Sequence, residues 1–298
     1  MLAPSLTPSS SRRYRLASVL ALLAVVTLVT LSTARAQDAA PSTNSAPSEE
    51  GQGTGVLHPA LFLVGDSIMQ TGSGNGDRGP WGWGSEIGAF FDPAKIHVCN
   101  EARGGRSSRS YIEEGWWTNV LARIQPGDFV ILQFGHNDSA NSDGHPNRAT
   151  ITGAGDETIQ LGIATNKTVV HSYGWYLRQY VADAKAKGAT PIICSPVPRN
   201  SWTNGKIKRG FDGYARWAAD AAKAGGAFFI DLNTLAADRF DAFGQEKTAT
   251  YFNDFQHTKK IGAKLNAQCV VEGIKQLKDC PLASYLLPPS VAAANSQP

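Results

Sequence analysis

The sequence contains little cysteine. Only four of its 298 residues are cysteines, and no two of them form a C-x-x-C pair, so a structural zinc site of the common kind is not expected. Cys99 and Cys194 lie in apolar stretches and are expected to be small buried side chains. Cys269 and Cys280 lie close together near the end of the chain, where a disulfide would be possible in an exported protein.

Long apolar runs are also scarce, and the one present lies at the start of the chain. Leu16–Leu31 is largely apolar, follows arginines at positions 12, 13 and 15, and precedes Ala34-Arg35-Ala36. A basic start, an apolar middle and a small-residue ending indicate a secretory signal peptide over residues 1–36. The alternative is a membrane anchor, because the run is near the lower limit of roughly 17 residues for crossing a bilayer. We expect cleavage near Ala36 and a secreted or periplasmic protein.

Charge of one sign is lacking once this segment is removed. The full sequence carries a formal charge of +3, but residues 1–36 hold four arginines and no acid. The remaining 24 basic and 25 acidic side chains give −1. A basic surface for nucleic acid, or for a membrane after cleavage, is therefore not predicted.

Composition divides the mature chain into three parts. Residues 37–56 are rich in Ser, Pro, Ala and Gly, which is typical of a disordered linker. Residues 281–298 resemble this linker and are predicted to form a flexible tail, although residues 285–287 could pack locally. Between them, residues 57–280 contain no internal repeat and provide roughly 225 residues, enough for one large domain.

This domain alternates short apolar runs with helical periodicity, which predicts a parallel sheet with helices on both faces. The expected strands are Leu61–Val64, Lys95–Cys99, Asp128–Phe134, Pro191–Pro196 and Ala227–Leu232. The expected helices are Trp83–Phe91, Trp116–Ile124, Val169–Lys187, Gly213–Ala224 and Lys259–Leu277. The polar, glycine-rich segment Ser139–Lys167 is too long for an ordinary connection, which indicates a functional loop or lid. Pro196–Arg209 is a similar loop.

Polar blocks follow the strands of this predicted sheet. Ser67 comes after the first strand, Gly105 after the second and Asn137 after the third, while Asp254 and His257 lie beyond the fifth. The carboxyl ends of parallel strands meet at one edge of a sheet, so these residues are expected to gather there. Taken alone, Gly65-Asp66-Ser67 is better explained as an ordinary helix N-cap.

As a set, the residues suit acyl transfer. A serine hydroxyl becomes a nucleophile when a nearby base takes its proton, and His257 would be that base. Asp254, three residues earlier, would fix the tautomer of the imidazole. The backbone N–H groups of Ser67 and Gly105 and the side-chain amide of Asn137 would stabilise the oxyanion of the intermediate.

In order and spacing, these blocks resemble the GDSL or SGNH hydrolase superfamily over most of residues 60–278. The motifs that carry the resemblance are Gly105, Gly65-Asp66-Ser67, Gly135-x-Asn137-Asp138 and Asp254-x-x-His257. Three stretches within it are similar to rhamnogalacturonan acetylesterases: Asn100-Glu101-Ala102-x-x-Gly105-Arg106-Ser107-x-Arg109-Ser110-Tyr111, Phe134-Gly135-His136-Asn137-Asp138 and Trp175-Tyr176-Leu177.

The resemblance implies a three-layer α/β/α, flavodoxin-like fold with a five-stranded parallel sheet. It implies that Ser67, His257 and Asp254 are catalytic and that Ser67, Gly105 and Asn137 form the oxyanion hole. Phe255 departs from the family, which commonly has histidine or another polar residue after the catalytic aspartate.

The implied function is a carboxylic ester hydrolase that removes O-acetyl groups from the pectin rhamnogalacturonan. Its partner would be an acetylated acidic polysaccharide, and we expect a monomer without a cofactor. The alternatives are the same chemistry on acetylxylan, another acetylated glycan, a lipid or a thioester. A non-catalytic carbohydrate-binding protein is a further alternative, although every catalytic group is present.

Five residues are candidates for contact with substrate. Trp81 and Trp83 follow the nucleophile and could stack on sugar rings. Arg106 and Arg109 could bind uronate carboxylates, with structural ion pairs as the equal alternative. His136 could position the loop that presents Asn137.

A metal cluster is a weaker alternative for part of this region. His136 could join three nearby side chains as ligands, which are Asp138, Asp143 and His145. A polar loop after a strand explains these residues more simply, so no metal is expected.

Overall fold

The computed structural model describes residues 58–72, 79–139, 147–161 and 167–288. Its centre is an all-parallel sheet with the strand order β2-β1-β3-β6-β9. The strands are β1 (Ala60–Gly65), β2 (His97–Asn100), β3 (Phe129–Gln133), β6 (Thr190–Cys194) and β9 (Phe228–Ile230). The prediction of an α/β fold around five parallel strands is confirmed.

Alternation along β1 sends side chains into two separate cores, one on each face of the sheet. Leu61 and Leu63 enter one core, whereas Phe62 and Val64 enter the other, because successive side chains of a strand point to opposite faces. All four are at most 3% exposed. A central strand buried on both faces reads as a continuous apolar run, which is why this segment was recognisable.

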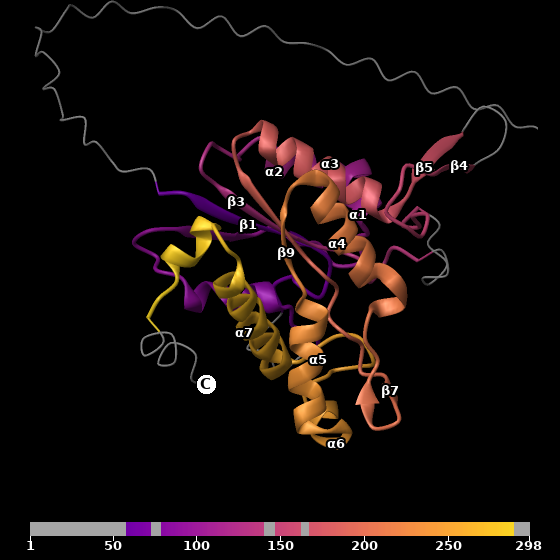
Figure 1. The fold of residues 1–298 in the computed structure, drawn as a ribbon, viewed down its shortest axis with the longest axis vertical. Helices are drawn as coiled ribbons and strands as arrows, with labels where there is room; N and C mark the ends of the chain where they lie inside the picture. Colours follow the sequence, from indigo (N-terminus) through magenta and orange to yellow (C-terminus); the bar gives the residue numbers. More distant parts are fainter. Residues whose placement is uncertain (1–57, 73–78, 140–146, 162–166, 289–298) are drawn as a thin grey trace, which may run out of the picture. The chain divides into compact units, whose positions relative to one another are not determined.

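The two cores are covered by different helices, so the fold has three layers (Figure 1). The Phe62 side is covered by α1 (Ser108–Glu113), α2 (Trp116–Leu121), α3 (Tyr173–Ala186) and α4 (Tyr214–Gly225). The Leu61 side is covered by α5 (Leu232–Phe243), α7 (Lys260–Gln276) and the 3-10 turns η1 (Trp83–Ser85) and η2 (Ile87–Phe90). A short helix, α6 (Gln245–Ala249), follows α5.

Two helix predictions need correction. The segment predicted as a helix over Trp83–Phe91 forms only the turns η1 and η2. The helix predicted from Val169 begins at Tyr173, where Ser172 accepts a hydrogen bond from the Trp175 backbone as its N-cap. Before it, β5 (Thr168–His171) pairs antiparallel with β4 (Thr158–Leu161). Its β-branched residues favour a strand once a partner strand is present.

The region after β9 was also misread. The predicted strand Ala227–Leu232 is only three residues long, because α5 begins at Leu232. Asp231 caps that helix by accepting a hydrogen bond from the Thr234 backbone. Helices α1, α5 and α6 were not predicted, whereas those at Gly213–Ala224 and Lys259–Leu277 are confirmed within a residue or two by α4 and α7.

Both predicted loops contain short strands. β4 lies within Ser139–Lys167, of which residues 140–146 and 162–166 fall outside the described residues. In the Pro196–Arg209 loop, β7 (Trp202–Thr203) pairs with β8 (Lys206–Ile207). The turn between them is Asn204-Gly205, both with positive φ, as a two-residue hairpin loop requires.

The folded unit extends past the predicted boundary at residue 280. Pro281–Tyr285 forms the 3-10 turn η4, in which Leu282 is fully buried. Leu286 forms a β-bridge with Phe91, and Tyr285 contacts the ring of Phe129. Residues 281–287 are therefore part of the folded unit, contrary to the prediction of a tail from residue 281, and the local packing of residues 285–287 is observed. Residues 289–298 lie outside the described residues.

The remaining expectations concern the cysteines and the chain start. All four cysteines are free, including Cys269 and Cys280, which are both buried. The predicted signal peptide (1–36) and linker (37–56) lie outside the described residues. Among the helices described, none is long and apolar enough to cross a bilayer.

Candidate active site

Ser67 lies two residues beyond β1, at the carboxyl edge of the sheet. A side chain at Gly65 would place its Cβ 2.5 Å from the Gln133 carbonyl oxygen of the neighbouring strand β3, so only glycine fits there. The chain then turns: the Asp66 carbonyl accepts hydrogen bonds from Met69 and Gln70, and its carboxylate accepts one from Ile68. A hydrogen-bonded turn, rather than a long helix, therefore holds Ser67.

Three side chains from the first and last blocks are joined by hydrogen bonds. The Ser67 hydroxyl oxygen lies 2.9 Å from His257 Nε2, and His257 Nδ1 lies 2.9 Å from Asp254 Oδ2. A carboxylate only accepts, so Nδ1 carries the ring proton and Nε2 accepts the proton of Ser67. This tautomer is the one in which an imidazole acts as a general base.

The Asp254 carboxylate is tied to its own loop as well. Its Oδ1 accepts the backbone N–H groups of Gln256 and His257, each at 2.7 Å. Partial burial alone would raise the pKa of Asp254, but these hydrogen bonds and the His257 side chain outweigh burial, so the pKa is lowered from its ordinary value. The carboxylate therefore stays ionised over the whole neutral range.

A second set of hydrogen bonds ties this loop to the segment after the nucleophile. Trp81 donates its backbone N–H to the Thr258 carbonyl at 2.8 Å, and the Thr258 hydroxyl donates to the Trp81 carbonyl at 2.9 Å. Asn253 donates its backbone N–H to the His257 carbonyl at 2.8 Å. These contacts fix the position of His257 relative to the segment that follows Ser67.

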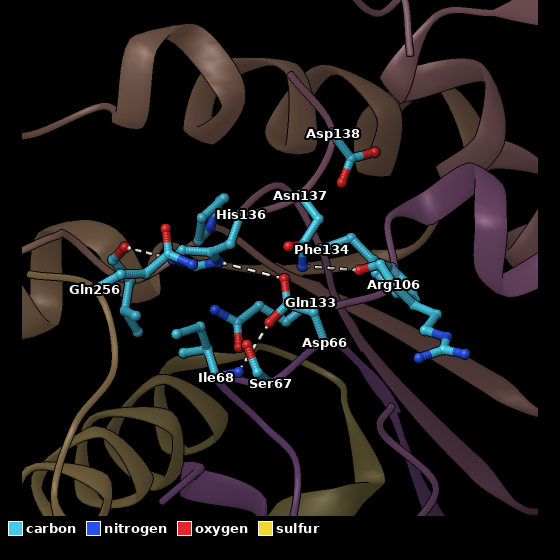
Figure 2. A network of polar contacts seen from close by, with 12 residues as sticks. Asp66, Ser67, Ile68, Arg106, Gln133, Phe134, His136, Asn137, Asp138 and Gln256 are labelled. Atoms are coloured by element: carbon cyan, nitrogen blue, oxygen red, sulfur yellow. Dashed lines mark hydrogen bonds and ion pairs between the residues drawn. The ribbon is translucent and has the colours of Figure 1, made fainter. Parts of the chain in front are cut away.

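The predicted oxyanion donors come from the second and third blocks. Gly105 has φ of +73°, a left-handed conformation that favours glycine. A Cβ on its neighbour Gly104 would lie 3.6 Å from the Ser67 Cβ, so this loop borders Ser67. The Asn137 amide donates to the Arg106 carbonyl at 3.1 Å, which joins the two blocks (Figure 2).

His136, which precedes Asn137, is buried among polar groups. His136 Nδ1 is 3.4 Å from Asp66 Oδ2, with both side chains fully buried, and His136 Nε2 is 3.2 Å from the Val197 carbonyl oxygen (Figure 2). The structure thus places His136 within the loop that presents Asn137, under the nucleophile turn.

Asp138 is held in the same interior. Its carboxyl accepts hydrogen bonds from the backbone and hydroxyl of Ser108, the latter at 2.5 Å. Burial raises the pKa of Asp138 to about 7, assisted by the nearby negative charge of Asp66 and opposed by the hydrogen bonds from Ser108. This group fastens the third block to the start of α1.

The two tryptophans predicted to stack on sugars are mostly enclosed. Trp83 has no exposed surface and donates its indole N–H to Gln133 at 2.6 Å. It therefore offers no face to a sugar, and the prediction for Trp83 is wrong. Trp81 is 9% exposed and donates its indole N–H to Glu86 at 2.7 Å, so little of its ring is open to a sugar.

The two arginines are held by acids of this chain. Arg109 is 4% exposed, pairs with Glu113 at 2.8 Å and donates to the Ala149 carbonyl. Arg106 pairs with Glu114 at 2.8 Å. These contacts favour the structural alternative for both residues.

Four residues near the site were not singled out from the sequence as substrate contacts. Phe255, beside Asp254, is 58% exposed, and Arg199 donates to Gln256 at 2.9 Å. Lys208 lines a cavity with them. A guanidinium nitrogen of Arg148 lies 3.1 Å from where a Cβ on Gly105 would stand. Only Phe255 carried a signal, its departure from the family pattern.

A metal centre has little support from the geometry. Across the described ranges, no three His, Cys, Asp or Glu side chains gather as a metal site would require. Two of the four candidate ligands, Asp143 and His145, lie outside the described residues.

Comparison with known proteins identifies the class. The GDSL-like lipase/acylhydrolase family matches residues 63–258, about two thirds of the chain, and the protein belongs to this family. It is therefore a carboxylic ester hydrolase with the SGNH arrangement of blocks.

Two curated relatives narrow the comparison. The chain is 35% identical over 223 residues to the probable rhamnogalacturonan acetylesterase YesY of Bacillus subtilis, covering 73% of this chain and 93% of the relative. It is 29% identical over 220 residues to a rhamnogalacturonan acetylesterase of Emericella nidulans, covering 74% of this chain and 86% of the relative.

Solved structures support the fold. YxiM of Bacillus subtilis superposes with a TM-score of 0.60 at 24% identity. The match covers 74% of this chain and 57% of the YxiM chain. The acetylxylan esterase Axe2 of Geobacillus stearothermophilus superposes with a TM-score of 0.53 at 19% identity, covering 74% and 95%.

Proposed function

We propose that this esterase removes O-acetyl groups from rhamnogalacturonan through Ser67, His257 and Asp254. The observation that carries the proposal is the continuous contact from the Ser67 hydroxyl to His257 and on to Asp254, 2.9 Å at each step. The substrate class is supported by the two curated relatives, both described as rhamnogalacturonan acetylesterases.

The first half of the reaction transfers the acetyl group to the enzyme. Ser67 Oγ attacks the acetyl carbonyl carbon while its proton passes to His257 Nε2. The imidazolium that forms is stabilised by the ionised Asp254 carboxylate at Nδ1. When the tetrahedral intermediate collapses, the bond between the carbonyl carbon and the sugar oxygen breaks, and His257 returns the proton to that oxygen.

The second half releases acetate. A water molecule attacks the acetyl-enzyme carbonyl and gives its proton to His257. The bond to Ser67 Oγ then breaks, the serine regains its proton, and acetate leaves. In both halves the negative oxygen would be stabilised by the N–H groups of Ser67, Gly105 and Asn137.

The test is acetate release from acetylated rhamnogalacturonan, acetylxylan and p-nitrophenyl acetate. Wild type should release acetate from rhamnogalacturonan at a higher kcat/KM than from acetylxylan, and Ser67→Ala should abolish release from every ester. Ser284→Ala, an exposed serine on η4, is the matched control and should behave as wild type. Selective release from acetylxylan would refute the pectin substrate, and full activity of Ser67→Ala would refute the nucleophile.

We also propose export with cleavage after Ala36 and action as a monomer. Expression with residues 1–36 intact, followed by mass determination of the recovered protein, should give a chain beginning at Gln37, and sedimentation should give a single-chain mass. Recovery of the full-length chain in the membrane fraction would favour an anchor instead.

A further inference from the structure

A cavity of about 370 Å³ lies beside the acid–base loop, and no step of the reaction described above uses it. One of the residues that line it is Phe255, which directly follows Asp254 in the sequence. Arg199, on another wall, donates to Gln256, the residue before His257, and Asn200 donates its backbone N–H to the Phe255 carbonyl at 2.9 Å. The cavity is therefore within two residues of the general base.

Cations outnumber acids on its walls. Arg199, Lys208 and Arg209 face Asp212 as the one acid among the lining residues. Arg209 is neutralised by Asp238 and Asp241, at 2.7 Å each. The Asp212 carboxylate is 86% exposed and lies 3.8 Å from Arg199, a loose pair that solvent screens.

Lys208 provides a positive charge that is not balanced by the acids described above. Its side chain is exposed, and among the described residues no carboxylate pairs with its ammonium group. An ammonium with no partner at the rim of a cavity attracts a ligand carboxylate.

Two aromatic rings also line the cavity, both beside the Arg199 guanidinium. Phe255 is 58% exposed, and Phe211, also in the wall, packs its ring 4.4 Å from that of His136. The Arg199 guanidinium lies 4.2 Å from the Phe211 ring centre and 5.2 Å from that of Phe255, so the two rings hold its plane in position.

The backbone at Phe211 and Asp212, in this wall, has an unfavourable conformation. Phe211 and Asp212 have φ of +47° and +54°, and the flanking Gly210 and Gly213 also have positive φ. Left-handed conformations are unfavourable for a non-glycine residue, and such strain concentrates at ligand sites. Here the strain sets Phe211 into the cavity wall.

We propose that this cavity is a subsite for a hexuronate residue of the polysaccharide, on the same chain as the acetylated sugar. The sugar ring would lie on the Phe255 ring, and its carboxylate would bind Lys208 and Arg199. A neutral sugar would contact only the Phe255 ring, and an inorganic anion would bind only Lys208 and Arg199. The inference rests on the proposed action on an acidic polysaccharide.

The test measures binding without catalysis. Calorimetry with trigalacturonate and with xylotriose, both free of acetyl groups, compares wild type with Phe255→Ala, Lys208→Ala and Lys208→Arg. Lys278→Ala, an exposed lysine beyond α7, is the matched control. We expect the Kd for trigalacturonate to rise about fivefold in Phe255→Ala and about threefold in Lys208→Ala, with recovery in Lys208→Arg.

Xylotriose should bind more weakly than trigalacturonate and should not respond to Lys208→Ala. Equal affinity for both sugars, or an unchanged Kd for trigalacturonate in both alanine variants, would overturn the subsite. Hydrolysis of p-nitrophenyl acetate should stay at the wild-type rate in the control Lys278→Ala. Trigalacturonate binding without acetate release from rhamnogalacturonan would refute the proposed function alone, whereas acetate release with unaltered binding in the variants would refute the subsite alone.

Discussion

Replacing Asp254 by asparagine separates the two tasks of its carboxylate. An asparagine carbonyl oxygen can keep the hydrogen bonds from the Gln256 and His257 backbones, which are 2.7 Å each in the wild type. Its NH₂ group would then face His257 Nδ1, where the carboxylate now accepts at 2.9 Å. Two donors cannot share one bond, so the ring proton would move to Nε2 and the base facing Ser67 would be lost.

The size of the effect follows from the exposure of Asp254. The same change in a serine protease, where the aspartate is buried, lowers kcat about 10⁴-fold. The Asp254 side chain is 48% exposed, so water can partly replace it. We therefore expect a loss of about 10³-fold in kcat, or about 4 kcal/mol of transition-state stabilisation.

The assay pairs kcat on p-nitrophenyl acetate with Tm. Asp254→Asn should keep Tm within about 2 °C of wild type because its backbone hydrogen bonds persist. Asp254→Ala loses them as well, so its stability should fall by about 1 kcal/mol. An Asp254→Asn variant that retains more than a third of the wild-type kcat would refute the tautomer argument.

Three further perturbations test the surroundings of the site. Gly105→Ala should lower stability by about 1 kcal/mol through its positive φ and reduce kcat on p-nitrophenyl acetate by displacing the backbone N–H; an unchanged kcat would remove Gly105 from the oxyanion hole. Arg109→Ala should destabilise by about 2 kcal/mol in urea, because Glu113 and the Ala149 carbonyl lose their partner, with KM for rhamnogalacturonan unchanged; a selective rise in KM would restore the uronate role. Burial raises the pKa of Asp138 to about 7 in the folded protein, against its ordinary value of 3.8, so unfolding releases its proton at pH values between these two. The free energy of unfolding of wild type should therefore fall by about 3 kcal/mol relative to that of Asp138→Asn between pH 4.5 and pH 8. If urea denaturation shows the same pH dependence for both proteins, the raised pKa is contradicted.

The parts of the fold that depend on local pattern were predictable from the sequence. A strand buried on both faces, such as Leu61–Val64, needs an uninterrupted apolar run, and α7 needs helical periodicity over many residues. The site residues were predictable too, since Ser67, Asn137 and His257 each follow an element in the order that the family uses. The structure brings Ser67 and His257 into contact across 190 positions of sequence.

The errors arose where distant contacts decide the structure. Thr168–His171 forms a strand because Thr158–Leu161 lies beside it, and no local signal announces that pairing. Trp83 follows the nucleophile at a spacing suited to a binding platform, but Gln133 on another strand accepts its N–H inside the core. Arg199 and Phe255 meet only in the folded chain, because 56 positions separate them.

The double hydrogen bond between Trp81 and Thr258 has a consequence for how the enzyme loses activity. Asp254 and His257 stand on a short, largely exposed loop, and these bonds join the end of that loop to the segment that follows Ser67. Such a loop can open by local unfolding while the buried strands stay paired. Heating should therefore abolish acetate release, reversibly, at temperatures where the circular dichroism of the sheet and helices is still native. In the native state, the exchange of amide hydrogens at residues 251–258 should be faster than in β1 and β3.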